Sequence, residues 1–211
     1  MNDFTDALAD AAAATETALL KLIPSGSGPE AQVVEAMRYS VMAGGKRLRP
    51  FLVLACADLF NVSRSCSERV AAAFEMVHTY SLIHDDLPAM DNDNLRRGKL
   101  TCHLEFDEAT AILAGDALLT LAFEVLSDLD THDSAKVRSD LVLEVARAVG
   151  AHGMVGGQML DLVAEDHTLG VSEITRLQRM KTGALINCSC QSGAILGKAS
   201  DTQRHLLSAY A

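Results

Sequence analysis

The chain has 211 residues, of which 49% are hydrophobic and 4% aromatic, and its 18 basic and 28 acidic side chains give a formal net charge of −10. This length fits one large domain, or a domain that lacks parts, rather than two complete domains. The acidic balance disfavours non-specific binding to nucleic acid or to an anionic membrane, because both need clustered positive charge. No nucleic-acid partner is therefore expected.

Cysteine usage and the amino-terminal residues bear on the cellular compartment. The five cysteines contain no C-x-x-C pair, which argues against a disulfide scaffold and against a zinc ribbon. The first residues lack the charged start, apolar segment and cleavage site of a signal peptide, and no run of about 18 apolar residues occurs. We expect a cytoplasmic protein without stable membrane insertion.

The long segments are rich in Ala, Leu, Met and Glu, and the chain has no Trp, so an all-α fold is predicted. One helix is expected from Pro29 to about residue 43, where Gly44 and Gly45 stop it. Another should begin near Ser67 and continue until Pro88 interferes with it. Further helices are expected near 106–129, 134–149, 152–165, 172–197 and from 202 onward. Their short connections predict an antiparallel helix bundle.

An acidic segment follows the second of these helices. It reads His84-Asp85-Asp86-Leu87-Pro88-Ala89-Met90-Asp91-Asn92-Asp93 and holds four carboxylates within nine residues. Such crowded carboxylates normally require cations, and their hard oxygen ligands suit Mg²⁺, which shares its other coordination positions with water and substrate phosphates. The alternative is a solvated acidic helix terminus, although negative charge there opposes the helix dipole. A calcium EF-hand loop starting at Asp91 is excluded, because Arg96 takes the place of the required glycine.

Two basic segments flank the acidic one along the chain. Gly44-Gly45-Lys46-Arg47-Leu48-Arg49-Pro50 precedes it, Arg96-Arg97-Gly98-Lys99 follows it, and each carries a charge of +3 against −4 for residues 85–93. Alone, either segment is more often a solvated face. Together with the carboxylates they suit a diphosphate held between cationic side chains and metal-bearing carboxylates. A nucleotide P-loop is excluded, because Arg47 stands where Ser or Thr should follow the lysine and no strand precedes it.

Helical spacing adds weaker signals. His78 and Asp85 are seven residues apart and should project from one helix face, although a lone histidine on an apolar helix is usually a core residue. Gln158 and Asp161 are spaced i, i+3, and Lys181-Thr182-Gly183 interrupts a later helix. Polar pairs at such spacing are common on exposed helices.

Taken together, these segments closely resemble those of the trans-isoprenyl diphosphate synthases. The similarity extends from about residue 35 to residue 197, and its motifs are Gly44–Pro50, His78, Leu82–Asp91, Arg96–Gly98, Gly115-Asp116, Gly157–Leu162 and Lys181–Gly183. The four residues between the second and third aspartates, Leu87 to Met90, are similar to the spacing in bacterial farnesyl diphosphate synthases. The resemblance implies antiparallel helices around a central cavity, usually in a homodimer. It also implies Mg²⁺-dependent condensation of dimethylallyl or geranyl diphosphate with isopentenyl diphosphate to give farnesyl diphosphate.

The resemblance also implies roles for individual residues, by position. Asp85 and Asp91 would hold Mg²⁺ on the allylic diphosphate, and Asp86 would support that geometry. Contacts to the allylic substrate would come from Arg96, Lys181 and Thr182, with Gln158 also in the substrate-binding set. The residues expected to bind isopentenyl diphosphate are Lys46, Arg49, His78 and Arg97.

Product length should depend on the depth of the apolar cavity beneath the carboxylates. Tyr80 and Ser81, about one turn before Asp85, would line its floor. A bulky Tyr80 favours a C15 product, whereas a small residue there would allow C20 or longer.

One family feature is absent from this sequence. A second Asp-rich motif, Phe-Gln-x-x-Asp-Asp-x-x-Asp, belongs to the family, but Asp201 is the one acidic residue after Lys181. We therefore expect residues 1–211 to form a single polyprenyl synthase domain lacking the C-terminal third and its helices. The chain is then part of a longer protein, a shortened form of one, or a non-catalytic relative, and the residues retained through Lys181 favour the first two. The alternative functions are a partner subunit that modulates a full-length synthase, and a C20 synthase.

Overall fold

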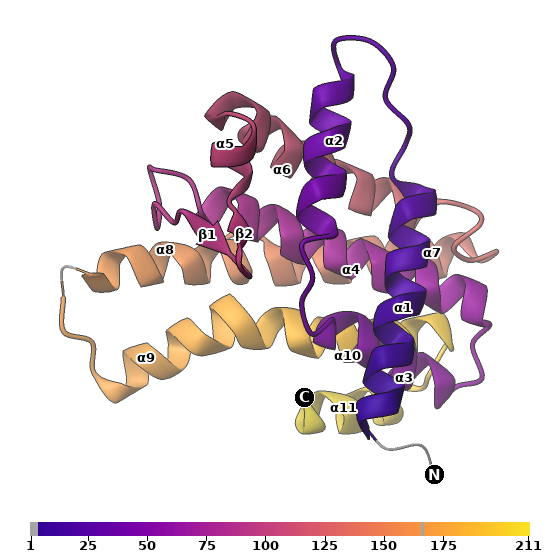
Figure 1. Ribbon diagram of the computed structural model, residues 1–211. Coiled ribbons are helices and arrows are strands. Elements are labelled where there is room, and N and C mark those ends of the chain that lie inside the picture. The colour runs from indigo at the N-terminus through magenta and orange to yellow at the C-terminus, as the bar shows by residue number, and fades with distance from the viewer. Residues whose placement is uncertain (1–3, 166) are drawn as a thin grey trace. The chain divides into compact units, whose positions relative to one another are not determined.

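The structure is a computed structural model that describes residues 4–165 and 167–211 (Figure 1). It confirms the predicted all-α class, because helices dominate and the strands in the described ranges are two residues long. The elements in chain order are α1 Phe4–Leu22, α2 Ala31–Val41, α3 Leu48–Asp58, α4 Arg64–Asp85, β1 Leu95–Arg96, β2 Lys99–Leu100, α5 Cys102–Glu105, α6 Glu108–Ser127, α7 Ala135–Val149, α8 Met154–Glu165, α9 Val171–Gln178, the π-helix η1 Arg179–Gly183, α10 Ala184–Leu196 and α11 Asp201–Tyr210.

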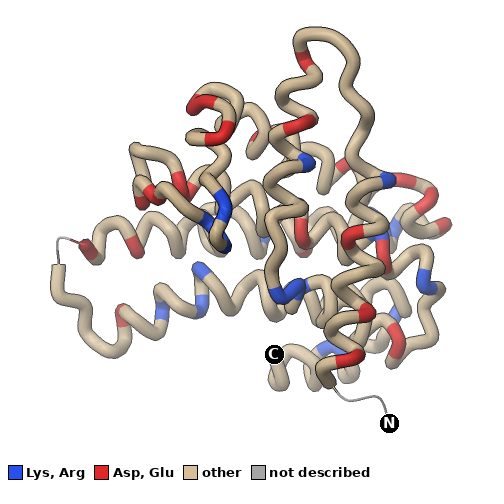
Figure 2. Tube along the Cα trace, in the orientation of Figure 1, with Lys and Arg blue, Asp and Glu red and all other residues tan. Residues whose placement is uncertain are grey.

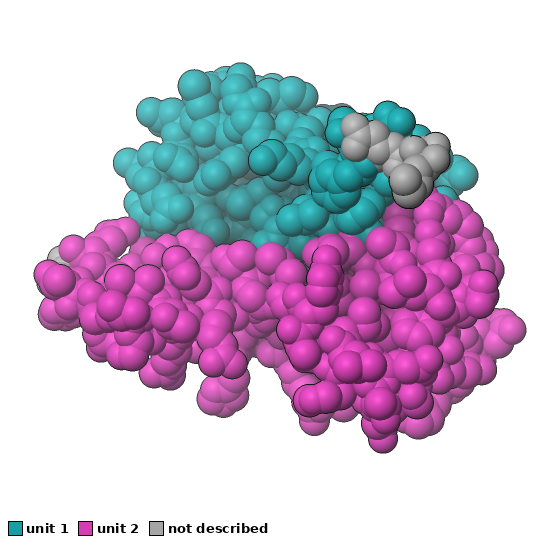
Figure 3. Space-filling view, turned by 90° about the horizontal axis from the view of Figure 1, so that it is seen from below, with its two compact units in different colours: residues 1–51, 68–126 teal, residues 52–67, 127–211 magenta. Residues whose placement is uncertain are grey.

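The chain divides into two compact units, coloured separately in Figure 3. Unit 1 comprises residues 1–51 and 68–126, and unit 2 comprises residues 52–67 and 127–211. The acidic segment and both basic segments fall in unit 1. The Gln158 and Lys181 motifs fall in unit 2. Each unit is described by itself below.

Unit 1 has α4 and α6 in its core. From Val70 to Val77 every side chain of α4 is buried, which is typical of a central helix rather than a surface one. In α6, Ala111, Ala114, Leu118 and Ala122 form a fully buried stripe at helical spacing. Among the described residues α6 is the one helix long and apolar enough to cross a membrane, a test that the core helix of a globular protein also passes.

Unit 2 is built around α10. Every residue of this helix from Cys188 to Leu196 is buried, and the helix packs against α7 and α11. Gly193 permits a close approach within the unit, because a Cβ there would lie 2.7 Å from the Cβ of Cys56. The π-helix η1 packs against α8, the helix that carries Gln158 and Asp161.

The structure refines the predicted element boundaries. The predicted segments at 106–129, 134–149, 152–165 and 202 onward contain α6, α7, α8 and α11, and the 172–197 segment contains α9, η1 and α10. The helix expected to reach residue 43 ends at Val41, and Gly44 and Gly45 beyond it have positive φ values of +88° and +125°. Helices α1 and α3 and the β1–β2 hairpin were not predicted.

Candidate active site

The acidic segment begins where α4 ends, at Asp85. The backbone N–H of Asp91 donates to the Asp85 carbonyl at 2.9 Å, so the turn around Pro88 brings the backbones of the two predicted metal ligands within hydrogen-bond distance. Asp85 is half-buried and Asp91 is exposed. Among the described residues, no group of three or more His, Cys, Asp or Glu side chains forms a metal site by itself. A carboxylate pair still fits Mg²⁺, which protein sites usually bind through one or two carboxylates plus substrate phosphates and water.

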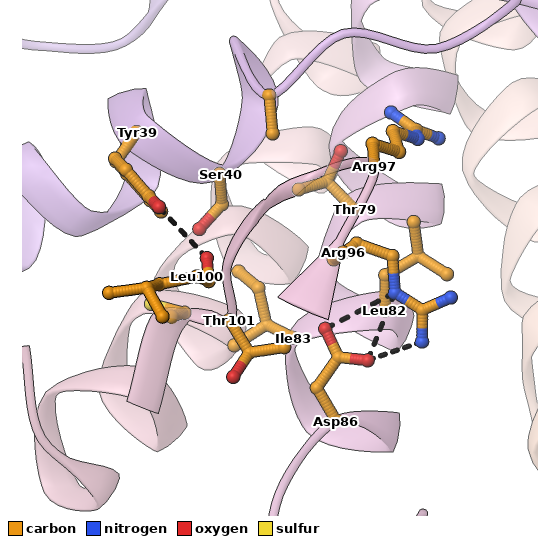
Figure 4. Close-up of a pocket in the computed structure, with 12 residues that line it drawn as sticks. Tyr39, Ser40, Thr79, Leu82, Ile83, Asp86, Arg96, Arg97, Leu100 and Thr101 are labelled. Atoms are coloured by element: carbon orange, nitrogen blue, oxygen red, sulfur yellow. Dashed lines mark hydrogen bonds and ion pairs between the residues drawn. The ribbon is translucent and has the colours of Figure 1, made fainter. Parts of the chain in front are cut away.

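Asp86 lies beside this pair but has a different environment. It is 3% exposed, and the Arg96 Nε donates to its two carboxylate oxygens at 3.0 and 3.3 Å (Figure 4). The Nη2 of Arg96 also donates to Asp86, and to Asp93 at 3.2 Å. Burial, together with the charges of Asp93 and Asp91, raises the pKa of Asp86 although Arg96 acts in the opposite direction, and the hydrogen bond to Asp86 raises the pKa of Arg96. Sequence reasoning gave no role to Asp93.

A tight hairpin presents Arg96 to α4. Arg97 and Gly98 at its tip have φ values of +54° and +80°, as a two-residue type I′ turn requires. The Tyr39 hydroxyl donates to the Leu100 carbonyl at 2.8 Å and so ties the hairpin to α2 (Figure 4). A small pocket lies here, lined by side chains of α2, α4 and the hairpin. Figure 2 shows acidic residues along the loop between α4 and β1 and basic residues on the hairpin.

The second basic segment meets the hairpin within unit 1. The Nη1 of Arg97 donates to the Gly44 carbonyl. A Cβ on Gly45 would lie 2.3 to 2.7 Å from the Arg97 guanidinium and would displace it, and the φ of +125° at Gly45 favours glycine at this position. Arg49 is half-buried, its Nε has no hydrogen-bond partner, and burial lowers the pKa values of both Arg49 and Arg97.

His78 shares this positive environment. Burial, followed by repulsion from Arg49 and Arg97, lowers the pKa of His78 to about 3, so the imidazole is neutral at pH 7. The structure thus brings together three of the four residues predicted to bind isopentenyl diphosphate. The fourth, Lys46, is exposed in the same loop.

Arg47 behaves differently from the other cations of its segment. It is 3% exposed, and its guanidinium donates to Glu75 at 2.5 Å, to Glu16 at 3.2 Å and to the Val41 carbonyl at 2.5 Å. Glu16 and Glu75 were missed by sequence reasoning. A usable signal was the position of Glu75 within the otherwise apolar run of α4.

The two residues predicted to set product length lie on α4, just before Asp85. Tyr80 is 6% exposed, and its ring meets the His84 ring edge-on with centroids 5.8 Å apart. Burial, reinforced by the charge of Asp85, raises the pKa of Tyr80 to about 12. The Ser81 hydroxyl donates to the His78 carbonyl at 2.9 Å, so it is engaged with its own helix.

Unit 2 carries the remaining predicted residues. Lys181 lies in η1 and donates to Asp161 of α8 at 2.5 Å. A Cβ on Gly157 would lie 2.3 Å from the Lys181 backbone nitrogen, so this glycine allows η1 to approach α8. Both polar atoms of the Gln158 amide are buried without a hydrogen-bond partner, whereas Thr182 is exposed. Local π-helices of this kind are frequent at functional sites.

Comparisons with known proteins point to a single family. The polyprenyl synthetase family model matches residues 30–211. The chain is 53% identical over 176 residues to farnesyl diphosphate synthase of Escherichia coli (strain K12), covering 83% of this chain and 58% of that protein. It is 47% identical over 199 residues to farnesyl diphosphate synthase of Geobacillus stearothermophilus, covering 94% of this chain and 67% of that protein.

The similarity extends to solved structures. The apo crystal structure of an FPP/GFPP synthase from Zymomonas mobilis matches with a TM-score of 0.93 and 48% identity, covering 96% of this chain and 74% of that one. The chain therefore spans between about half and three quarters of the length of these relatives. On the family match, the shared fold and the sequence identity, the chain belongs to the polyprenyl synthetase family.

Proposed function

We propose that this chain carries the diphosphate-binding machinery of a trans-prenyltransferase that condenses isopentenyl diphosphate with dimethylallyl or geranyl diphosphate to give farnesyl diphosphate. The main observation is that unit 1 holds two acidic residues joined by a backbone hydrogen bond, Asp85 and Asp91, and also a cationic cluster formed by the half-buried Arg49 and the exposed Arg97. One diphosphate needs a metal-bearing carboxylate site, and the second needs cationic side chains. Relatives named as farnesyl diphosphate synthases support this assignment.

Asp85 and Asp91 are the residues that would hold Mg²⁺, with the allylic diphosphate as a further ligand. When bound there, the ion neutralises negative charge that develops on the departing diphosphate. Asp86 would support this geometry without binding the ion itself, because it is buried and accepts a hydrogen bond from Arg96 directly after the end of the same helix. The Arg96 guanidinium adds positive charge toward the allylic diphosphate.

Arg49, Arg97 and Lys46 would bind isopentenyl diphosphate through charge-assisted hydrogen bonds. Guanidinium groups suit this task because they stay protonated even where burial lowers their pKa values. His78 is neutral, so we propose that it contributes a directed N–H donor rather than a charge.

The unit 2 residues would act on the allylic substrate. Asp161 orients the Lys181 ammonium, which we assign to the allylic diphosphate, and the unpartnered Gln158 amide and the exposed Thr182 hydroxyl can both hydrogen-bond a ligand. Loss of diphosphate leaves an allylic cation, which the Thr182 hydroxyl dipole would help to stabilise.

The proposal includes a C15 product, and the bulky, buried side chain of Tyr80, five residues before Asp85 on α4, supports it. Assembly as a homodimer and a cytoplasmic location are further parts of it.

The test is incubation of the intact natural protein with Mg²⁺, geranyl diphosphate and labelled isopentenyl diphosphate. We expect a C15 product that is lost on chelation and in Asp85→Ala, whereas Asp130→Ala, at an exposed acidic residue of unit 2, keeps full turnover. Turnover that survives both chelation and Asp85→Ala contradicts the proposal. No product alone, together with altered products on mixing with a full-length synthase, favours the partner function.

A further inference from the structure

We propose that Glu75 is a positioning residue for the isopentenyl diphosphate site, acting through Arg47 on the loop that carries the binding cations. This inference rests on the proposed function and adds a residue to it. Glu75 lies one helical turn before His78 on α4, on the same face. It is 2% exposed in an apolar helix, an unusual place for a carboxylate without a partner.

The partner is Arg47, whose side chain is completely buried. Its Nη1 donates to Glu75 at 2.5 Å, while its Nη2 donates to the Val41 carbonyl at 2.5 Å and to Glu16 at 3.2 Å. One guanidinium therefore joins the last residue of α2 to α1 and α4. Removal of Glu75 would leave the buried Arg47 guanidinium with the partly exposed carboxylate of Glu16 as its remaining counter-charge, so the Glu75 contact helps to fix the Arg47 side chain.

The Arg47 backbone in turn sets the position of the cations around it. Its φ of +50° is rare for a non-glycine residue, and its carbonyl accepts from the Phe51 N–H at 3.0 Å in the first turn of α3. Arg49 lies in that same turn. Arg97 lies against Gly44 and Gly45 of the same loop.

The charges around Glu75 support the same inference. The Glu75 carboxylate attracts both Arg49 and Arg97, whereas the two guanidinium groups repel each other. The carboxylate thus offsets part of this repulsion when no ligand is present. With Glu16 also counted, the three arginines Arg47, Arg49 and Arg97 still exceed the two carboxylates by one positive charge. Glu75 therefore keeps the cations assembled for a polyanion without cancelling their charge.

The primary test is calorimetric binding of isopentenyl diphosphate to the intact protein, because this readout does not require turnover. We expect Glu75→Gln to weaken binding by about ten-fold or more, since small misplacements of binding groups have effects of this size or larger. The KM for geranyl diphosphate should stay within about two-fold of the wild-type value. Glu35→Gln, at an exposed carboxylate of α2, is the matched control and should bind like the wild type.

The double variant Arg47→Met/Glu75→Met tests the positioning role of Glu75 independently of its effect on folding. A buried ion pair replaced by apolar residues is often neutral or stabilising, so this variant should fold even if Glu75→Gln does not. Weak isopentenyl diphosphate binding by the folded double variant is the expected result. Wild-type binding by either folded variant overturns the inference. A wild-type protein that binds isopentenyl diphosphate but forms no C15 product instead refutes the proposed function, and the binding comparison still decides the role of Glu75.

Discussion

Replacement of Tyr80 by alanine tests the proposal that this side chain limits product length. Tyr80 precedes Asp85 by five residues, about 7.5 Å along the helix axis, and the proposed function places the growing chain at this depth. The ring is 6% exposed and packs edge-on against His84. Tyr80→Ala should open this space, and products of C20 or longer should replace part of the C15 product.

The same substitution has a calculable cost in stability. Truncation of a buried aromatic residue to alanine typically costs about 3 to 5 kcal/mol. In a protein of this size each kcal/mol lowers the Tm by about 2 to 4 °C, so we expect a decrease of about 6 to 20 °C. Product analysis should therefore be done well below the reduced Tm, which calorimetry measures directly.

Tyr80→Phe is the matched control, because it keeps the ring and removes the hydroxyl. Burial holds the phenol pKa at about 12, so the hydroxyl remains protonated at assay pH and its loss should leave the product at C15. Chromatography of the labelled products measures chain length. A folded Tyr80→Ala protein that still stops at C15 would refute the assigned role of the ring. Equal lengthening in Tyr80→Phe would refute the steric argument.

Three further changes test other parts of the site. Gly45→Ala places a methyl group on the Arg97 guanidinium, and it should raise the KM for isopentenyl diphosphate at least ten-fold while the KM for the allylic substrate stays constant. Asp161→Asn removes the ion pair that orients Lys181 and should raise the KM for geranyl diphosphate, and an unchanged value would contradict this role. The folded-state pKa of His78 lies below its unfolded value of about 6.5, so the unfolded chain binds more protons between pH 3 and 6.5. The stability of the wild type should therefore fall as the pH decreases through this range, by up to about 1.4 kcal/mol per pH unit from this group. Urea unfolding of His78→Gln should show a correspondingly smaller decrease.

Local sequence signals predicted the fold class and most helices. Glycines 44 and 45 marked the end of α2, and Pro88 marked the region where α4 gives way to the acidic turn. Helix α3 was missed because its apolar segment follows the basic motif, and Pro50 in its first turn suggests a break although that position tolerates proline. The hairpin was missed because its strands are two residues long, too short to show alternation.

Local patterns also predicted which segments carry the chemistry, but not the role of every charge within them. Arg47 and Arg49 are identical in type and two residues apart, yet the Arg47 side chain is completely buried and paired with Glu75, whereas Arg49 is only half-buried. The difference depends on Glu16 and Glu75, which are 31 and 28 residues away from Arg47 along the chain. Such pairings follow from tertiary packing, which no local pattern contains.

The acidic and the basic segments of unit 1 have one structural feature in common. Each pairs a buried charged residue with an opposite charge, Asp86 with the partly exposed Arg96 in the first and Arg47 with the buried Glu75 in the second. A buried pair gains little net stability, because desolvation offsets the Coulomb attraction, but it fixes geometry strongly. A cluster of like charges would otherwise spread apart before its ligand arrives. The buried pairs therefore hold the neighbouring charges in place in advance, and the free energy of diphosphate binding need not be spent on assembling the site.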